Sequence, residues 1–138
     1  GLGLADRVIW AGPRTDVPSL LKAADVGVLA SHEEGFSNAV LEYMAARLPA
    51  VVTDVGGNAE AVSDGLTGFV VPAHDERSLA HALERLGEPR ERHLMGVAAR
   101  ERVEQLFSLE ACIDAYETLY QSVRDGRGLP ENLRPEIF

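Results

Sequence analysis

The apolar positions of the chain fall into short continuous runs that alternate with stripes at helical spacing. Continuous apolar runs of strand length occupy residues 7–11, 26–30, 50–53 and 68–71. Apolar residues three and four positions apart predict helices over residues 18–24, 37–47, 58–63, 76–86, 89–106 and 108–123. Because the strands are apolar throughout, we expect helices to cover both faces of their sheet. The pattern predicts an α/β fold with a Rossmann-like, doubly wound and mostly parallel sheet, followed by C-terminal helices.

Capping and breaking residues mark where several of these elements end. Asp75 and Ser108 are good N-cap residues for the helices that follow them, and Pro89 suits the first turn of a helix. Beyond residue 124, glycines and prolines break the helical period. We therefore divide the chain into a domain of residues 1–124 and a tail of residues 125–138.

Composition and charge narrow the class of protein. The 138 residues are 46% apolar and 25% charged, which is ordinary for one globular domain with a core. The net charge of −9 argues against nucleic acid as a partner, because a nucleic-acid binder needs a basic stripe facing the phosphates. A single diphosphate is still compatible with this charge, since local backbone amides can hold it.

The number of cysteines, the spacing of the histidines and the length of the apolar runs indicate which kinds of site and segment to expect. Cys112 is the only cysteine, so no intrachain disulfide can form, and its apolar neighbours predict a buried structural thiol. The four histidines show no metal-ligand spacing, so we expect no metal site. No apolar run approaches the ~18 residues of a membrane-spanning helix. We expect a cytoplasmic protein, and contact of a longer protein with a membrane surface stays open.

The loops that follow the strands are the first place to look for a ligand, because doubly wound sheets bind ligands beyond the carboxyl ends of their strands. These loops are residues 12–17, 31–37 and 54–58. The second loop contains Gly35, which permits close backbone approach, and it leads into a predicted helix. The amides of Phe36, Ser37 and Asn38 are free at that helix start, at the positive end of the helix dipole. A diphosphate fits there without a basic side chain.

Two carboxylates flank this helix start. Glu34 precedes the helix and Glu42 lies about one turn into it, so both are placed to accept hydrogen bonds from sugar hydroxyls beside a diphosphate. A structural alternative is that Ser31-x-x-Glu34 is a capping box, with acids favouring the dipole. Gly35 would then sit early in the helix, which is unfavourable. From the residues alone, the interpretation as a ligand-binding loop and the interpretation as a helix cap are about equally well supported.

A longer stretch around these residues resembles a known enzyme signature. The chain reads EGFSNAVLEYMAA from Glu34 and PAVVTDVGGNAEAV from Pro49, which resembles the signature of retaining GT-B glycosyltransferases of family 4, the Glu–seven residues–Glu enzymes. The likeness continues at residues 16–21, 24–31, 64–71 and 108–110. It covers about residues 4–122. The resemblance implies a partial C-terminal, donor-binding domain of a GT-B fold.

The resemblance also implies a role for each site residue. Glu34 would contact the donor sugar as the catalytic residue, and Glu42 would contact the nucleotide ribose. The backbone at Gly35, Phe36 and Ser37 would face the donor sugar and the diphosphate. The donor-binding residues are then Glu34, Gly35, Phe36, Ser37, Asn38 and Glu42.

Two further loops receive assignments from the resemblance. The loop after the first predicted strand, with Pro13 and Arg14, would approach the nucleotide base. Gly56 and Gly57 would shape a loop beneath the cleft, either as a turn that needs positive φ or by direct ligand contact. His32 is interpreted as a surface residue of the second loop.

The function implied is that of a glycosyltransferase that binds a nucleotide-diphosphate sugar for retaining transfer of a hexose to an acceptor that the sequence does not identify. No metal or other cofactor is expected. The alternative is a non-catalytic nucleotide-sugar-binding or interaction module of Rossmann type. The chain carries no N-terminal lobe with an acceptor site, and it lacks the Gly-rich turn and Arg/Lys pair that bind the diphosphate in the family. We therefore expect this chain alone to be inactive.

The sequence departs from the family pattern in two ways that affect the fold. Arg47 stands where the family usually has glycine after the helix, which predicts a different helix end or mild left-handed strain. Two βα units of the family domain are missing, so the strands predicted at 7–11 and 26–30 should not be neighbours. We expect the open edges to pair with a missing segment or a second copy. Part of the stripe Tyr116–Val123, which faces the N-terminal lobe in the family, should be exposed.

Overall fold

A three-stranded parallel sheet lies at the centre of the described part of the chain. The computed structural model describes residues 3–128 and 130. The strands are β1 (Gly27–Leu29), β2 (Ala50–Thr53) and β3 (Gly68–Val71). They pair in the order β1-β2-β3, with Val51 of β2 registered between Val28 and Phe69. The parallel sheet with its helices confirms the predicted α/β class and three of the four predicted strands.

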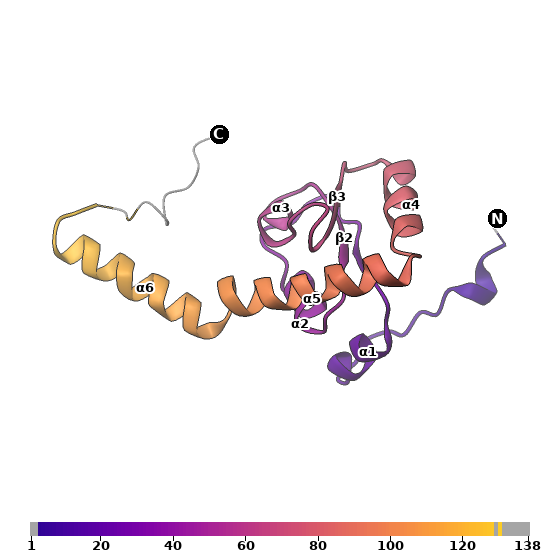
Figure 1. The fold of residues 1–138 in the computed structure, drawn as a ribbon, viewed down its shortest axis with the longest axis horizontal. Coiled ribbons are helices and arrows are strands. Elements are labelled where there is room, and N and C mark those ends of the chain that lie inside the picture. The colour runs from indigo at the N-terminus through magenta and orange to yellow at the C-terminus, as the bar shows by residue number, and fades with distance from the viewer. Residues whose placement is uncertain (1–2, 129, 131–138) are drawn as a thin grey trace.

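Helices connect and cover these strands (Figure 1). They are α1 (Val17–Ala23), α2 (Asn38–Ala45), α3 (Asn58–Ala61), α4 (Glu76–Arg85), α5 (Pro89–Leu106) and α6 (Leu109–Arg124), preceded by the 3-10 helix η1 (Ala5–Arg7). Each predicted helix is present, with ends within two residues of the prediction. Two expected N-caps form: the Asp75 carboxylate accepts from backbone amides of α4, and the Ser108 hydroxyl accepts from the first turn of α6 at 3.1 Å.

The core consists of two layers, one on each face of the sheet. Alternate residues of β2 point to opposite faces, so that Val52 packs against residues of α2 and α5, whereas Val51 packs against residues of α4 and α5. Both valines are fully buried. The first layer comprises Val40, Met44, Ala50, Val52, Ala61, Val62, Ala99 and Val103, and the second comprises Val51, Phe69, Val71, Ala82, Leu86 and Met95. Coverage of both faces by helices is therefore confirmed.

The strand predicted at residues 7–11 is wrong. The backbone there forms no strand, and the side chains of Ile9 and Trp10 are 90% and 92% exposed. A strand needs a neighbour to receive its backbone hydrogen bonds, and among the described residues this segment pairs with no strand of the sheet. Because no strand forms there, the predicted order of this strand and the next is not tested. β1 stands at one edge of the sheet with Val28 39% exposed, so the open edge is present as well.

The last helix extends away from the sheet (Figure 1). None of the residues of α6 is buried, and its apolar stripe is exposed. The large residues of that stripe are Leu109, Ile113, Tyr116, Tyr120 and Val123. The expected exposure of the stripe is thus confirmed, whereas the prediction of a buried Cys112 is wrong. Apolar neighbours predict burial only where a second element covers them, and the described residues place none on this face.

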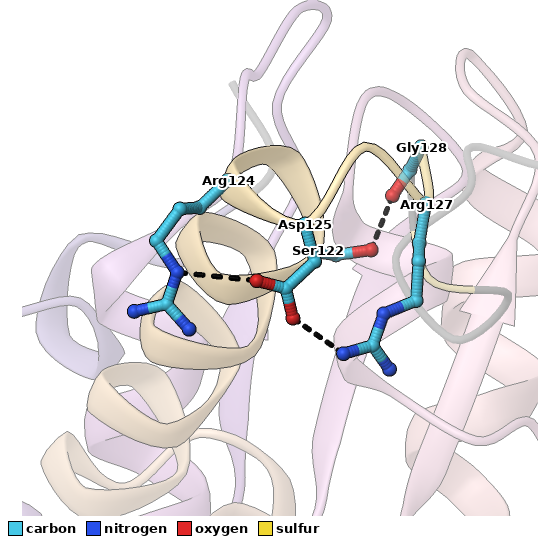
Figure 2. A network of polar contacts seen from close by, with 5 residues as sticks. All are labelled: Ser122, Arg124, Asp125, Arg127 and Gly128. Atoms are coloured by element: carbon cyan, nitrogen blue, oxygen red, sulfur yellow. Dashed lines mark hydrogen bonds and ion pairs between the residues drawn. The ribbon is translucent and has the colours of Figure 1, made fainter.

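A glycine turn ends α6 beside a small polar network (Figure 2). Gly126 has φ 69°, and its amide and that of Arg127 donate back to Val123 and Ser122, which is the Schellman pattern of helix ends. The Asp125 carboxylate accepts from Arg124 at 3.2 Å and also from Arg127, and the Ser122 hydroxyl donates to the Gly128 carbonyl. The helix ends where we placed the start of the tail, but residues 129 and 131–138 lie outside the described residues.

The end of α2 shows the predicted departure at Arg47. Its φ of 63° lies in the left-handed region that favours glycine, so the predicted strain is present. The Arg47 amide donates to Met44 and the Leu48 amide to Tyr43, each at 3.0 Å, which again is a Schellman end. α5 crosses close to this turn: a Cβ added at Gly96 would lie 2.2 Å from the Arg47 carbonyl oxygen. Helix packing thus holds the turn in place.

Candidate functional site

The loop between β1 and α2, residues 31–37, lies against the loop that follows β2. The Gly57 amide donates to the Gly35 carbonyl at 2.6 Å. Gly56 has φ 53°, and a Cβ added there would lie 2.1 Å from the Glu34 carbonyl oxygen. Any side chain at this position would push the loops apart. Gly56 and Gly57 therefore shape the loop that lies against residues 31–37, and the positive φ allowed for by the sequence is found at Gly56.

The Glu34 carboxylate is held by a neighbouring side chain of the same loop. The Ser31 hydroxyl donates to Oε1 of Glu34 at 2.6 Å. The helix, however, starts only at Asn38, with Ser37 as its N-cap residue. The capping-box interpretation of Ser31 and Glu34 is wrong, because both residues lie before the helix in the loop that packs on Gly56. A capping box would join each of these side chains to a backbone amide. The hydrogen bond that forms instead joins the two side chains, and it fixes a loop carboxylate rather than a helix end.

The start of α2, a few residues after Glu34 in the chain, presents unused backbone donors. Ser37 is buried in an extended conformation, with φ −84° and ψ 116°, and its side chain makes no capping hydrogen bond. Among the described residues, no acceptor receives the amides of Phe36, Ser37 and Asn38. These amides lie at the positive end of the helix dipole, where an anionic group is favoured.

Glu42 lies farther along α2, in a groove of about 390 Å³ that separates α1 from α2. The groove is otherwise lined by Val17, Pro18, Leu21, Lys22, Ala45, Ala46 and Arg100. Burial, and secondarily the nearby Glu42 carboxylate, raise the pKa of the adjacent Tyr43. The Tyr43 ring covers Gly27 of β1, where an added Cβ would lie 2.3 Å from the ring. The apolar wall from α1, with a carboxylate opposite, is suited to a small ligand with both an apolar face and hydroxyls.

Comparison with known proteins identifies this arrangement. The family model for glycosyl transferases group 1 matches residues 1–88 of the 138. The chain belongs to that family. The match agrees with the enzyme family that the Glu34–Glu42 signature resembles.

The chain is also similar to curated enzymes and to solved structures. N-acetyl-α-D-glucosaminyl L-malate synthase of Bacillus anthracis is 36% identical over 123 residues, which are 88% of the chain and 32% of that enzyme. Sucrose-phosphate synthase of Thermosynechococcus elongatus superposes with a TM-score of 0.80 at 33% identity, over 89% of the chain and 32% of the enzyme. The structure of Anabaena HepE in complex with UDP-glucose superposes with a TM-score of 0.79 at 28% identity, over 87% of the chain and 34% of HepE. The chain spans about a third of the length of the curated relatives it matches.

Pro13 and Arg14 of this group 1 chain precede α1, whose first residues line the Glu42 groove. The Arg14 guanidinium is exposed and bound to both oxygens of Asp16, at 2.8 and 2.7 Å. This ion pair lowers the pKa of Asp16 and raises that of Arg14. The guanidinium fork is thus already engaged, and contact with a nucleotide base stays a prediction for both residues.

The structure of the group 1 chain adds residues to the site that the sequence interpretation did not single out. Thr53, at the end of β2, donates from its hydroxyl to the Ser31 carbonyl at 2.7 Å, and the buried Asn58 amide donates to the Thr53 carbonyl at 3.0 Å. Phe36 packs against Phe107, with ring centroids 5.4 Å apart. Thr53 and Asn58 belong to the quoted signature, so their position at the carboxyl end of a strand was the available signal. Nothing local in the sequence pointed to Phe107, which comes from the junction of α5 and α6.

A second pair of side chains meets near this end of the sheet. The rings of His32 and His74 stack with centroids 4.5 Å apart, and both line a cleft of about 210 Å³. His32 is exposed, as expected of a surface loop residue. Among the described residues, no three His, Cys, Asp or Glu side chains gather closely enough to hold a metal ion. Over the same residues, no helix combines the length and apolar character needed to cross a membrane.

Proposed function

We propose that the chain forms the donor site of a glycosyltransferase that binds a nucleotide-diphosphate sugar and retains the anomeric configuration as it transfers a hexose to an acceptor. The observation that carries the proposal is the start of α2, where three unused backbone amides follow the Ser31-bound Glu34 closely in the chain. Amides at a helix start favour a diphosphate, and a fixed carboxylate accepts from sugar hydroxyls. The UDP-glucose complex of HepE supports this choice of ligand class.

The proposed roles follow the order of the residues along the loop and helix. Glu34 contacts the donor sugar near the reacting carbon, and the backbone from Gly35 to Asn38 binds the diphosphate. Glu42 accepts hydrogen bonds from the ribose hydroxyls, with the apolar side of α1 close by. Pro13 and Arg14, which precede α1, are proposed to approach the nucleotide base. We also propose that no bound metal is required, so that turnover should survive treatment with a chelator.

We propose that the chain acts as part of a longer transferase and is inactive alone. Transfer requires donor and acceptor to be held together, and this chain corresponds to about a third of its relatives. The acceptor would then bind largely to a second lobe. A non-catalytic module that binds nucleotide sugars is the alternative. The fixed carboxylate of Glu34 counts against a module that binds nucleotides alone, because a pure nucleotide binder has no need of a sugar-facing acid. Turnover in a protein that also carries the acceptor lobe distinguishes the transferase from a module that only binds the sugar.

Calorimetric titration with UDP and UDP-glucose tests the site, with Glu34→Ala and Glu42→Ala as variants. Loss of the ribose contact in Glu42→Ala should weaken UDP binding about tenfold. Glu34→Ala should leave UDP affinity nearly unchanged and, in a protein that also carries the acceptor lobe, lower turnover far more. Glu33→Ala and Glu101→Ala, both at exposed positions, serve as matched controls. Absence of binding by every nucleoside diphosphate and nucleotide sugar would contradict the proposal.

A further inference from the structure

We propose that Ser31 and Thr53 are positioning residues that fix the Glu34 carboxylate for the donor sugar; the inference rests on the donor site proposed above. The two hydroxyls and the carboxylate form one connected chain. Thr53 Oγ1 donates to the Ser31 carbonyl at 2.7 Å, and Ser31 Oγ donates to Glu34 Oε1 at 2.6 Å. The end of β2 is thereby linked to the acid through a single intervening residue.

The first link anchors the loop to the sheet. Thr53 is the last residue of β2 and is buried, so its hydroxyl has a fixed position. The same hydroxyl lies 3.4 Å from the Leu29 carbonyl, and the Asn58 side chain binds the Thr53 carbonyl at 3.0 Å. The carbonyl of Ser31 is therefore tied to the most rigid part of the fold. A valine at position 53 has nearly the same shape but cannot donate this hydrogen bond.

The second link fixes one oxygen of the carboxylate. A hydrogen bond from a hydroxyl to an ionised carboxylate is short and relatively strong, as the 2.6 Å distance indicates. Among the described residues, no other donor contacts the Glu34 carboxylate, so Oε2 and the remaining lone pair of Oε1 stay available. A free glutamate side chain would lose rotamer freedom when it binds a sugar. Ser31 removes that freedom in advance, which favours binding.

The backbone of the acid is fixed from the opposite side. The Gly57 amide holds the Gly35 carbonyl at 2.6 Å, and Gly56 leaves no space between the loops at the Glu34 carbonyl. Glu34 is thus constrained at its main chain by the loop after β2 and at its carboxylate by Ser31. Both constraints come from the same end of β2. This arrangement assigns Ser31 and Thr53 to the orientation of the acid rather than to direct contact with the donor.

Saturation-transfer NMR with UDP-glucose tests the assignment, because the glucose, ribose and uracil protons report separately and weak binding is detectable. In Ser31→Ala, transfer to the glucose protons should fall about threefold relative to uracil, the loss expected when one hydrogen bond no longer orients the acid. Thr53→Val should show a smaller loss of the same pattern. Ser31→Thr keeps a hydroxyl and should restore the glucose signal. Ser122→Ala and Thr118→Val on α6 are matched controls that should change no signal.

The outcomes separate this inference from the donor site on which it rests. Unchanged glucose-to-uracil ratios in both Ser31→Ala and Thr53→Val would overturn the positioning role and leave the donor site intact. An equal loss at glucose, ribose and uracil would show general loss of the site and would also overturn the positioning role. No signal from any proton of the ligand with the wild-type chain would contradict the donor site itself. If Thr53→Val does not fold, the pair Ser31→Ala and Ser31→Thr decides the question.

Discussion

The four residues of β2 and the apolar run at residues 8–10 have similar character but opposite surroundings. Ala50, Val51 and Val52 are all fully buried, whereas Ile9 and Trp10 are about nine-tenths exposed. Each residue of β2 has a neighbouring strand on at least one side and helices above and below. The run at 8–10 has none of these among the described residues. Apolar, β-branched sequence therefore marks a segment able to form a strand, and the strand forms only where partners receive it.

The two long C-terminal helices repeat this contrast. α5 places Met95, Ala99 and Val103 in the core, while α6 buries no residue although its apolar stripe is longer. The difference lies in what covers each helix, because α5 crosses the sheet and α6 leaves it (Figure 1). Stability should accordingly be concentrated between β1 and α5. Substitutions outside that region should cost little.

The largest difference in the free energy of unfolding is expected between a substitution at Val52 and one at Ile9. Val52→Asp would place a carboxylate in the core without a partner, which costs several kcal/mol, on the order of the whole stability of a small domain. We expect this variant not to fold. Ile9→Asp should change the free energy of unfolding by no more than about 0.5 kcal/mol, as for other exposed positions. Circular dichroism during urea titration measures both. Similar losses for the two variants would mean that residues 8–10 are part of the folded core.

Much of the body was predictable because each of its signals is local. Asp75, Pro89 and Ser108 mark helix starts by their own chemistry, and the uninterrupted apolar character of 50–53 indicates burial on both faces. The strand at 7–11 and the burial of Cys112 were wrong for one shared reason. Both interpretations assumed partners, and a partner lies elsewhere in the chain or beyond it, where local pattern carries no information.

The candidate site was predictable to the level of the loop but not of its contacts. Gly35, Ser37 and the two glutamates lie where the signature places them, at a helix start beyond a strand. The hydrogen bond from Thr53 joins residues that are 22 positions apart in sequence, so no spacing rule reveals it. The spacing of Ser31 and Glu34 suggested a helix cap that does not form, and the hydrogen bond between their side chains was not predicted. The roles of these residues toward a donor stay predictions.

The second-largest effect on stability is expected where α5 crosses the end of α2. Gly96→Ala should destabilise the fold by about 2 kcal/mol, because the added methyl would meet the Arg47 carbonyl and force the helices apart. This loss outweighs the gain of ~1 kcal/mol that alanine brings in a helix interior. Glu101→Ala, exposed on the same helix, should change the free energy of unfolding only slightly. If Gly96→Ala stabilised the protein, the close packing of the two helices would be disproved.

A smaller effect should distinguish the two Schellman ends. Arg47→Gly relieves left-handed strain at the end of α2. It should raise the free energy of global unfolding by about 0.5–1 kcal/mol, after the entropy cost of glycine. Gly126→Ala introduces comparable strain at the end of α6. Because α6 is not part of the core, it should lower only the hydrogen-exchange protection of the last turn of the helix. A large drop in global stability from Gly126→Ala would show that α6 unfolds together with the body.

The smallest effect on stability is expected on the exposed stripe of α6, where Ile113 and Tyr120 are 48% and 67% exposed. The double variant Ile113→Ser, Tyr120→Ser should leave the free energy of unfolding within about 0.5 kcal/mol of the wild type. Val103→Ser on α5 is the matched buried control and should cost several times more, because it leaves a cavity and a buried hydroxyl.

The double variant Ile113→Ser, Tyr120→Ser also tests self-association, which we expect from an apolar surface that no other element covers. Light scattering should show less association for the double variant than for the wild type. If the wild-type chain is fully monomeric at high concentration, the exposed stripe and the open edge of β1 do not bind a second copy, and the expected self-association is contradicted.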